Sequence, residues 1–245
     1  MTRNKPSDTD VLILCGGQGT RFREVRRDIP KCLAPIRGRA FIDILLDQLI
    51  GQGFRRFILA TGYLGDQVKE HVLCRGDATY IFSKESGALG TAGAIKFAEP
   101  FLHSDPFIIL NGDSFINYPL GTLLNYHRDD SSDVTVLLSS AIKELEYGKV
   151  QMGHNRRVIS FVGKFEQSST RLTNAGVYCF NFKILNEIPR DKRVSLEFDC
   201  LPTWVSRFLV TGIETQEMVY DIGTVDRYRI AQSTELISES GQWNG

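Results

Sequence analysis

The chain has 245 residues, 42% hydrophobic and 24% charged, and its 29 Lys and Arg residues balance 29 Asp and Glu residues. This composition excludes a largely disordered chain, and the length favours one domain over residues 1–245. A formal net charge of zero argues against a dedicated nucleic-acid-binding protein, although it leaves room for a small anionic ligand. No apolar run approaches the roughly 20 residues of a membrane span, so we expect neither a nucleic-acid nor a membrane partner.

Cysteine usage indicates the redox environment. The chain has five cysteines, an odd number, and no C-x-x-C pair, which is typical of reduced thiols rather than of a disulfide scaffold or a zinc ribbon. The first ten residues also lack the apolar stretch of a signal peptide, so we expect a cytoplasmic protein. Cys15 is expected to be a small core residue.

The first half of the chain alternates short apolar runs with amphipathic segments. The helix expected at 42–50 has apolar residues at i, i+3, i+4, i+7 and i+8, which form one face. The expected strands cover 11–15, 56–60, 78–82 and 107–110, and the expected helices cover 42–50, 64–73 and 91–98. This alternation predicts parallel β-α-β units in an α/β, Rossmann-like, doubly wound mixed sheet.

The second half has a different pattern, with short strands separated by turn residues. The expected strands cover 134–139, 149–152, 158–162 and 173–180, and helices are expected near 201–208 and 225–237. We expect these strands to form a small antiparallel β insertion that lies over the sheet.

A glycine-rich loop follows the first expected strand, with the sequence L-C-G-G-Q-G-T-R at 14–21. Glycines let the backbone approach a ligand and point several N–H groups at one place, which suits phosphate oxygens. A P-loop would end in Gly-Lys-Ser/Thr, and a dinucleotide-binding turn would have a third glycine where this chain has Phe22. An ordinary tight turn remains an alternative interpretation.

Basic residues are concentrated just after this loop. Seven occur at 21–39, opposed only by Glu24 and Asp28: Arg21, Arg23, Arg26, Arg27, Lys31, Arg37 and Arg39. On a neutral chain this local excess suits a polyphosphate ligand, with a solvated basic face as the alternative. Arg21 and Lys31 are the two that we single out.

The paired motif G-G-x-G-T-R and Pro30-Lys31 resembles the signature G-x-G-T-R…P-K of sugar-phosphate nucleotidylyltransferases. The resemblance covers roughly residues 10–235 and continues in chain order through L-G-T-A-G at 89–93, N-G-D at 111–113, Y-G at 147–148, N-A-G-V-Y at 174–178 and D-I-G-T at 221–224. It implies one domain of the nucleotide-diphospho-sugar transferase fold, with a nucleotide-binding half at 10–133 and a sugar-phosphate-binding half at 134–240. Within the family, E-x-x-x-L-G-T-A-G-A is most similar to guanylyltransferases acting on mannose-type or heptose 1-phosphates.

The family reaction implies that a sugar 1-phosphate oxygen attacks the α-phosphorus of a nucleoside triphosphate and that pyrophosphate leaves. The resemblance assigns catalytic roles to Arg21, Lys31, Asp113 and Lys164. It assigns Mg²⁺ to Asp113 and Asp221, and each carboxylate follows an apolar segment, where open α/β sheets bind ligands. A turn or helix-cap aspartate is the alternative for either.

The remaining site residues follow from the same motifs. The expected nucleotide-binding residues are Leu14, Gly16, Gly17, Gly19, Thr20, Glu85, Gly90 and Thr91. The expected sugar-binding residues are Asn111, Gly148, Asn174, Gly176 and Glu197. Glu197 could equally be a residue that starts a helix.

Glu85 gives a physical argument for the base. Guanine presents two adjacent donors, N1–H and the 2-amino group, and one carboxylate can accept both. Uracil and thymine present one donor flanked by acceptors, whereas adenine and cytosine present an acceptor beside their amino group. Glu85 therefore favours GTP if it points inward, and the alternative is an exposed loop residue next to Lys84.

The sugar is indicated less directly. Relatives acting on glucose-type substrates often carry F-x-E-K-P, whose glutamate bonds sugar hydroxyls, and this chain has F-V-G-K-F with Gly163 and Phe165. This departure leaves room for a bulkier sugar, and we expect a D-glycero-α-D-manno-heptose 1-phosphate, a GDP-sugar product and a role in cell-envelope glycan synthesis. Mannose 1-phosphate is one alternative, and a non-catalytic, nucleotide-sensing subunit of the same fold is another. A homo-oligomer is left open.

Overall fold

The computed structural model describes residues 5–17, 28–141, 148–162 and 170–236. Its main sheet has nine strands within these ranges, seven of them in one hydrogen-bonded row. The row runs β10 (Val158–Val162), β9 (Lys149–Met152), β11 (Thr173–Phe180), β6 (Phe107–Asn111), β1 (Asp10–Leu14), β4 (Arg56–Thr61) and β5 (Thr79–Lys84). β8 (Val134–Ser139) and β12 (Val210–Thr215) branch from this row, because β8 pairs with both β11 and β12.

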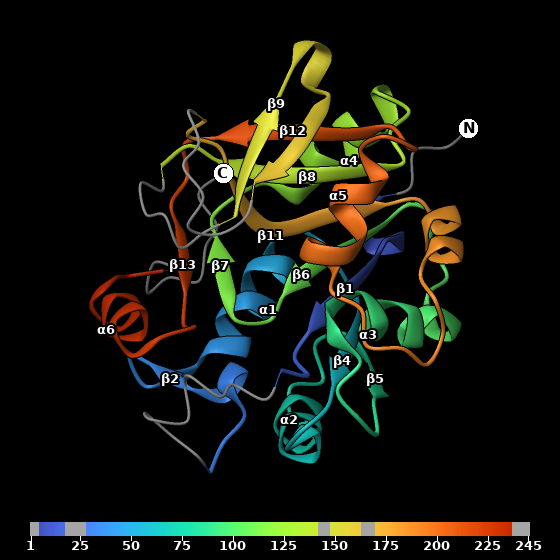
Figure 1. The fold of residues 1–245 in the computed structure, drawn as a ribbon. Coiled ribbons are helices and arrows are strands. Elements are labelled where there is room, and N and C mark those ends of the chain that lie inside the picture. The colour runs from blue at the N-terminus through green and yellow to red at the C-terminus, as the bar shows by residue number, and fades with distance from the viewer. Residues whose placement is uncertain (1–4, 18–27, 142–147, 163–169, 237–245) are drawn as a thin grey trace.

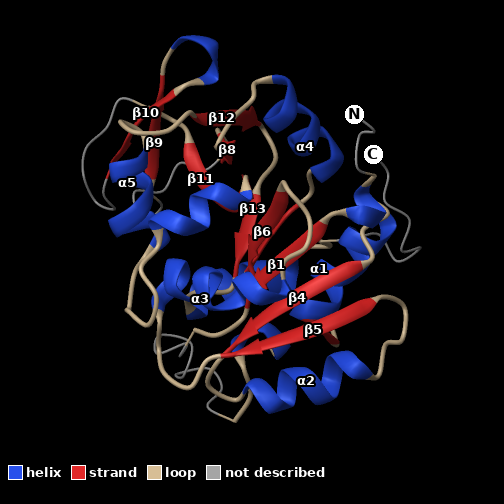
Figure 2. Cartoon of the chain, turned by 90° about the vertical axis from the view of Figure 1, so that its right-hand side faces the viewer, coloured by secondary structure: helices blue, strands red, loops and turns tan. Residues whose placement is uncertain are grey.

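The centre of the sheet confirms the parallel β-α-β interpretation. β1 lies parallel to β4 and to β6, and β4 lies parallel to β5. The middle of β1 is completely buried because both faces of the sheet are covered. Figure 2 shows β4 and β5 as arrows that end on the same side of the molecule. The carboxyl ends of the parallel strands therefore meet at one edge.

Helices cover both faces of this sheet, as the doubly wound prediction requires. On one face, α1 (Phe41–Gly51), α2 (Gly65–Leu73), α4 (Leu120–Asp129) and α6 (Val225–Ser233) share a core with Val11 and Ile13. On the other face, α3 (Gly90–Ala98) and α5 (Leu201–Trp204) share a core with Leu12. Figure 1 shows α1 and α3 on opposite sides of β1 and β6. Alternate residues of β1 thus belong to different cores, which follows from the two-residue period of a strand.

The second-half strands have the expected bounds, but their expected position over the sheet is wrong. They extend the sheet itself: β11 pairs antiparallel with β6 through residues 177–180 and 107–110, and with β8 on its other side. The physical reason is that β6 would otherwise leave an unpaired edge of backbone N–H and C=O groups in the middle of the molecule. Only β9 and β10, an antiparallel pair, lie at the outer end of the row. β12 pairs parallel with β8.

Other elements differ from the expectation in extent. α4 and β12 were not expected, although Leu120, Leu123 and Leu124 are buried on one helical face. The expected helix at 201–208 is the short α5, preceded by a π-helical turn at Leu196–Cys200, and α6 ends at Ser233 rather than at 237. Two short strand pairs are β2 (Pro35–Ile36) with β3 (Arg39–Ala40), and β7 (Ser114–Ile116) with β13 (Val219–Asp221). Short 3-10 turns cover Pro6–Asp8, Lys31–Leu33, Glu99–Phe101, His154–Arg156 and Phe182–Glu187.

Two further expectations concern the whole chain. All five cysteines are free thiols, and Cys15 is partly buried against the core of the α1 face. Among the described residues, no helix has both the length and the apolar character needed to cross a bilayer.

Candidate functional site

The glycine-rich loop leaves β1 at the edge where the parallel strands end. The Gly112 N–H donates to the carbonyl oxygen of Leu14 at 3.0 Å. A Cβ on Gly112 would lie 2.7 Å from that oxygen, so this close contact between the ends of β1 and β6 requires a glycine. Gly17 is the last described residue of the loop. The predicted site residues Gly19, Thr20 and Arg21 lie outside the described residues.

Gly16 and Gly62 pack against each other at this edge. A Cβ on Gly62 would lie 2.8 Å from the Gly16 carbonyl oxygen and 2.9 Å from Glu85 Oε1. A Cβ on Gly16 would lie 3.0 Å from the same Glu85 oxygen. Sequence reasoning missed Gly62; the signal was a glycine directly after the apolar strand β4. The two glycines leave room for the Glu85 carboxylate beside the loop.

Glu85 is half-buried and is not the exposed loop residue of the alternative interpretation. Its Oε2 accepts a hydrogen bond from the Leu89 N–H at 3.3 Å, and its Oε1 faces Gly16 and Gly62. Neighbouring Lys84 turns away and pairs with Asp66 at 2.7 Å. Burial raises the pKa of Glu85, although the Leu89 N–H acts in the opposite direction. The carboxylate thus lies against the first predicted nucleotide-binding glycine of the loop.

Lys31 and Asp113 form an ion pair at the end of β6. Lys31 Nζ lies 2.5 Å from Asp113 Oδ2, and the two side chains are 16% and 39% exposed. Burial alone would raise the pKa of Asp113, but the charge and hydrogen bond of Lys31, together with hydrogen bonds from Ser114 and the backbone, lower the pKa below its ordinary value. The structure therefore brings together two predicted catalytic residues that are 82 positions apart.

Asp221 reaches the same place through the pairing of β7 with β13. The Ile222 N–H donates to the Asp113 carbonyl oxygen at 3.0 Å, so the backbones around the two aspartates are neighbours. Asp221 is only 8% exposed, and its Oδ1 accepts from the Gly223 N–H at 2.8 Å. A Cβ on Gly223 would lie 2.7 Å from Asp221 Oδ1 and 3.5 Å from Lys31 Nζ. Lys31 Nζ and Asp221 Oδ1 therefore both border the space in front of Gly223.

Arg227 is a residue that sequence reasoning missed. Its Nη1 lies 3.1 Å from Asp221 Oδ2 and 3.4 Å from Oδ1, so one N–H group faces both carboxylate oxygens. The Arg227 side chain is 17% exposed. No sequence motif marks this arginine, because its role depends on the turn that carries the chain from β13 into α6.

The donor set of this cluster suits Mg²⁺. The described residues contain no group of three or more His, Cys, Asp and Glu side chains placed to hold a metal. Asp113 and Asp221 could supply two carboxylates, and Mg²⁺ usually takes one or two carboxylates while phosphates and water complete its shell. The residues fit a metal that is held jointly by the protein and a phosphate ligand.

The sugar-side residues meet where β11 begins. Gly176 has φ +74°, and a Cβ on it would lie 2.6 Å from Asn111 Nδ2. The Asn174 N–H donates to the Gly148 carbonyl oxygen at 3.1 Å. Four residues predicted to bind the sugar therefore lie together, next to the end of β6. Lys164, predicted to act on the same side, lies outside the described residues.

Glu197 joins this group through its carboxylate. Oε2 accepts from the hydroxyl groups of Thr91 at 2.9 Å and Ser195 at 3.2 Å. Oε1 accepts from the Tyr178 hydroxyl at 3.4 Å, and that hydroxyl accepts from Asn174 Nδ2 at 2.8 Å. Burial and the Glu197 charge raise the pKa of Tyr178, so the phenol remains a donor. Glu197 lies in the first turn of the π-helix, as the alternative anticipated, and it also contacts the sugar-side group.

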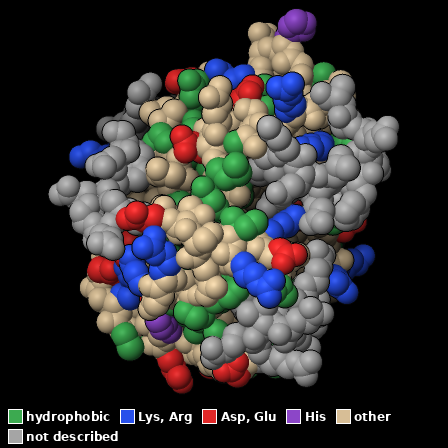
Figure 3. Space-filling model, turned by 90° about the vertical axis from the view of Figure 1, so that its left-hand side faces the viewer, with side chains coloured by type: hydrophobic (Ala, Val, Ile, Leu, Met, Phe, Trp, Pro, Cys, Tyr) green, Lys and Arg blue, Asp and Glu red, His purple; other side chains and the backbone are tan. Residues whose placement is uncertain are grey.

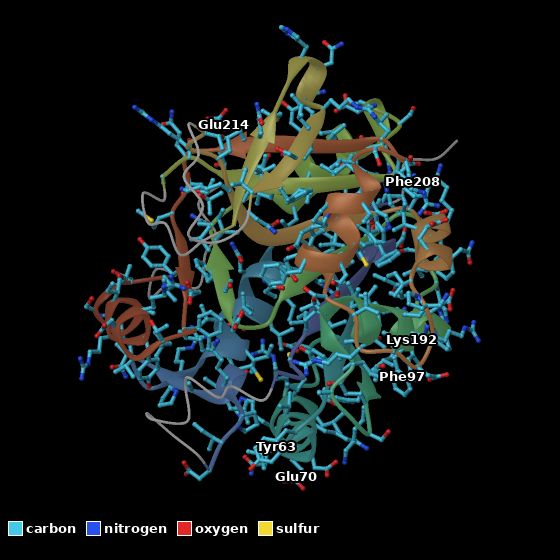
Figure 4. All side chains as sticks on the ribbon, in the orientation of Figure 1. Tyr63, Glu70, Phe97, Lys192, Phe208 and Glu214 are labelled. Atoms are coloured by element: carbon cyan, nitrogen blue, oxygen red, sulfur yellow. The ribbon has the colours of Figure 1, made fainter. Side chains whose placement is uncertain are left out.

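The L-G-T-A-G segment packs α3 against residues 194–197. Gly90 has φ +74°, and a Cβ on it would lie 2.5 Å from the Val194 carbonyl oxygen. The Thr91 hydroxyl accepts from the Leu196 N–H at 2.7 Å, in addition to its bond with Glu197. Figure 4 shows Lys192, which comes just before residues 194–197 in the chain, close to α3. The contacts of Thr91 are thus with the sugar-side segment, and the nucleotide-binding roles of Gly90 and Thr91 stay predictions.

On the face that Figure 3 shows, the charged groups are mixed in sign. Figure 3 shows basic and acidic side chains interspersed over the described part of one face of the molecule. This distribution agrees with the zero net charge of the sequence. Two ion pairs are therefore distinguished by their position at the strand ends and not by an excess of one charge sign around them: Lys31 with Asp113, and Arg227 with Asp221.

Comparison with known proteins gives concordant matches. The nucleotidyl transferase family model matches residues 10–236. A D-glycero-alpha-D-manno-heptose 1-phosphate guanylyltransferase of Aneurinibacillus thermoaerophilus is 33% identical over 225 residues, which cover 91% of this chain and 96% of the relative. The crystal structure of HddC from Yersinia pseudotuberculosis complexed with GMP-PN has a TM-score of 0.81 and 32% identity, and the match covers 92% of this chain and 98% of that one.

A longer relative matches as well. The mannose-1-phosphate guanylyltransferase catalytic subunit beta of Drosophila pseudoobscura pseudoobscura is 29% identical over 220 residues, which cover 88% of this chain. The chain spans 59% of the length of that relative. The matches confirm the family resemblance and the α/β fold that the sequence predicted. Since the family model covers both halves of the chain, this protein belongs to the nucleotidyl transferase family.

Proposed function

We propose that the chain transfers GMP from GTP to a sugar 1-phosphate. The observation that carries the proposal is the meeting of Lys31, Asp113 and Asp221 at the strand ends, where Glu85 also lies against the glycine-rich loop. The names of the heptose and mannose relatives, and the GMP-PN in the Yersinia complex, support a guanine nucleotide and a sugar phosphate.

The reaction forms one bond and breaks one. A phosphate oxygen of the sugar 1-phosphate bonds to the α-phosphorus of GTP, and the bond from that phosphorus to the bridging oxygen breaks as pyrophosphate leaves. Both reactants are anionic, so alignment and charge neutralisation supply most of the catalysis. Lys31 offers a fixed positive charge at this place, and Arg21 is proposed to contact the leaving pyrophosphate.

Asp113 and Asp221 are proposed to hold Mg²⁺ when substrate is bound. The metal would supply further positive charge and orient the phosphate oxygens. In its absence Lys31 neutralises Asp113, and Arg227 faces Asp221. For Asp113 to receive a metal, Lys31 must turn from the carboxylate toward the phosphates, which its long flexible stem permits.

Glu85 is proposed to select guanine. Its Oε1 faces the loop glycines, while its Oε2 is held by the Leu89 N–H. The ionised carboxylate can accept from both guanine N1–H and the 2-amino group, because each oxygen has two acceptor positions. The raised pKa of Glu85 means that this acceptor is lost at a higher pH than for an ordinary glutamate.

The proposed sugar is a D-glycero-α-D-manno-heptose 1-phosphate, with mannose 1-phosphate as the second candidate. The first is favoured by the full-length match to the Aneurinibacillus relative, whereas the Drosophila relative exceeds this chain by a large part of its length. Asn174 and Glu197 are the proposed hydroxyl readers. A cytoplasmic location and a role in envelope glycan synthesis remain predictions.

A pyrophosphate-release assay tests the proposal. GTP, UTP, CTP and ATP are each combined with heptose, mannose and glucose 1-phosphates in the presence of Mg²⁺, and Asp113→Asn serves as the inactive control. We expect the highest kcat/KM for GTP with the heptose 1-phosphate. A preference for another nucleotide refutes the role of Glu85, and a preference for mannose 1-phosphate selects the second candidate. Stabilisation by GTP without turnover of any pair would indicate a nucleotide-sensing subunit.

A further inference from the structure

Acidic and basic side chains are interleaved in the cluster at the end of β6. Lys31 pairs with Asp113 at 2.5 Å, and Arg227 contacts Asp221 at 3.1 Å. Each carboxylate of the proposed metal site therefore has a cation of the protein beside it. Together these four side chains carry no net charge.

The backbone of Arg227 is held in place by the start of α6. Thr224 is the N-cap of this helix, and its hydroxyl accepts from the Arg227 N–H at 3.4 Å. The next residue, Tyr228, is buried and donates its hydroxyl to the Pro35 carbonyl oxygen at 2.7 Å. Pro35 follows the 3-10 turn that contains Lys31. The start of α6, which carries the Arg227 backbone, is thus anchored beside the turn that carries Lys31.

The charges have opposite consequences for a free metal and for a metal on a triphosphate. A free divalent cation that approaches Asp221 is attracted by the carboxylate but repelled by Arg227, a guanidinium that never loses its proton. The complex of a divalent cation with a nucleoside triphosphate keeps a net negative charge, and both Arg227 and Lys31 attract it. The same arginine therefore disfavours one species and favours the other.

We propose that Arg227 suppresses the binding of free divalent cations at Asp221, so that the metal enters the site together with the triphosphate. The proposal rests on the proposed function, because that function assigns a metal to Asp221. Arg227 is a positioning residue in this scheme: it orients the Asp221 carboxylate and sets the metal affinity of the empty enzyme. A structural salt bridge that only anchors α6 would not have this effect.

The test measures Mn²⁺ binding to the nucleotide-free protein by electron paramagnetic resonance of the free ion. Arg227→Met and Arg227→Gln remove the charge, and Arg227→Lys keeps it. Arg229→Met is the matched control, because Arg229 lies on the same helix and pairs with Asp226, and it is 72% exposed. We expect the two neutral variants to bind Mn²⁺ about tenfold more tightly than the wild type, within the range of ordinary site-to-site coupling. Arg227→Lys and Arg229→Met should resemble the wild type.

A second arm separates this inference from the proposed function. With a non-hydrolysable GTP analogue present, the wild type should bind Mn²⁺ tightly and the difference between wild type and Arg227→Gln should shrink. If the wild type binds Mn²⁺ with the analogue but neither neutral variant gains affinity without it, the role of Arg227 is refuted and the proposed function stands. An equal gain in Arg229→Met would show a general charge effect and also refute the proposal. If Asp221→Asn in the Arg227→Gln background keeps the gain, the metal is not at Asp221, and both the inference and that part of the proposed function fail.

Discussion

Replacement of Glu85 by glutamine changes one oxygen into an amide nitrogen with almost no change in shape. In the wild type, Oε2 accepts from the Leu89 N–H at 3.3 Å, and Oε1 faces Gly16 and Gly62. A glutamine that keeps the bond to Leu89 must place its NH₂ group where Oε1 was. That group then faces two guanine donors. If the amide turns over, the oxygen meets guanine but the NH₂ group opposes the Leu89 N–H.

Either arrangement leaves one donor without its acceptor. A hydrogen-bonding mismatch of this kind costs about 1–3 kcal/mol, which corresponds to roughly 5- to 150-fold in affinity. We therefore expect Glu85→Gln to raise KM for GTP by a factor in this range. Turnover at saturating GTP should fall much less, because Glu85 is proposed to contact the guanine base and not the reacting phosphates.

The assay is pyrophosphate release with GTP, UTP, CTP and ATP at several concentrations of each. Lys84→Gln is the matched control: Lys84 adjoins Glu85 but pairs with Asp66 on the exposed side, so this change should leave selectivity unaltered. A Glu85→Gln enzyme that retains the wild-type preference for GTP would refute the proposal that Glu85 selects guanine. Equal losses for all four nucleotides would also do so, since they would indicate a distorted loop instead of a lost base contact.

The pKa of Glu85 extends the same reasoning to pH, and three other perturbations address the remaining parts of the edge. Because burial raises this pKa, KM for GTP should begin to rise at a higher pH than for an ordinary glutamate as the solution is acidified, and it should stay flatter in Glu85→Gln, as measured by initial rates. Lys31→Ala should raise the activation free energy of turnover by about 3–4 kcal/mol, with the fold intact by circular dichroism. Near-normal turnover at saturating substrate would contradict the role of Lys31. Asp113→Asn or Asp221→Asn should each nearly abolish turnover, with the double variant little worse than the poorer single one; small losses that add would argue against a shared metal. Gly62→Ala should lower the free energy of unfolding by about 1–3 kcal/mol in urea titrations, because its Cβ would lie 2.8 Å from a backbone oxygen, and an unchanged midpoint would contradict that contact.

The sequence by itself determined the order of most elements, without α4 and β12, and the places where function could lie. Alternating apolar runs and amphipathic segments indicate a doubly wound α/β sheet, because both faces of a parallel sheet must be covered. The polar residues after β1, β5 and β6 were recognisable as site residues, since parallel strands end at one edge. Periodicity states which residues share a face, however, and not which strand lies beside which. This is why the strands of the second half were expected over the sheet and are found within it.

Only the tertiary structure decided how these residues are combined. Gly62, Tyr178 and Arg227 became recognisable because β4, β11 and α6 bring them against Glu85, Glu197 and Asp221. Each of these contacts depends on the packing of one segment against another, and the pairs are between 6 and 23 positions apart in the chain. Ionic and steric complementarity acts through space, and it leaves no periodic trace in the sequence. The motifs therefore identify the reacting groups, whereas the fold determines which neighbours set their charge and position.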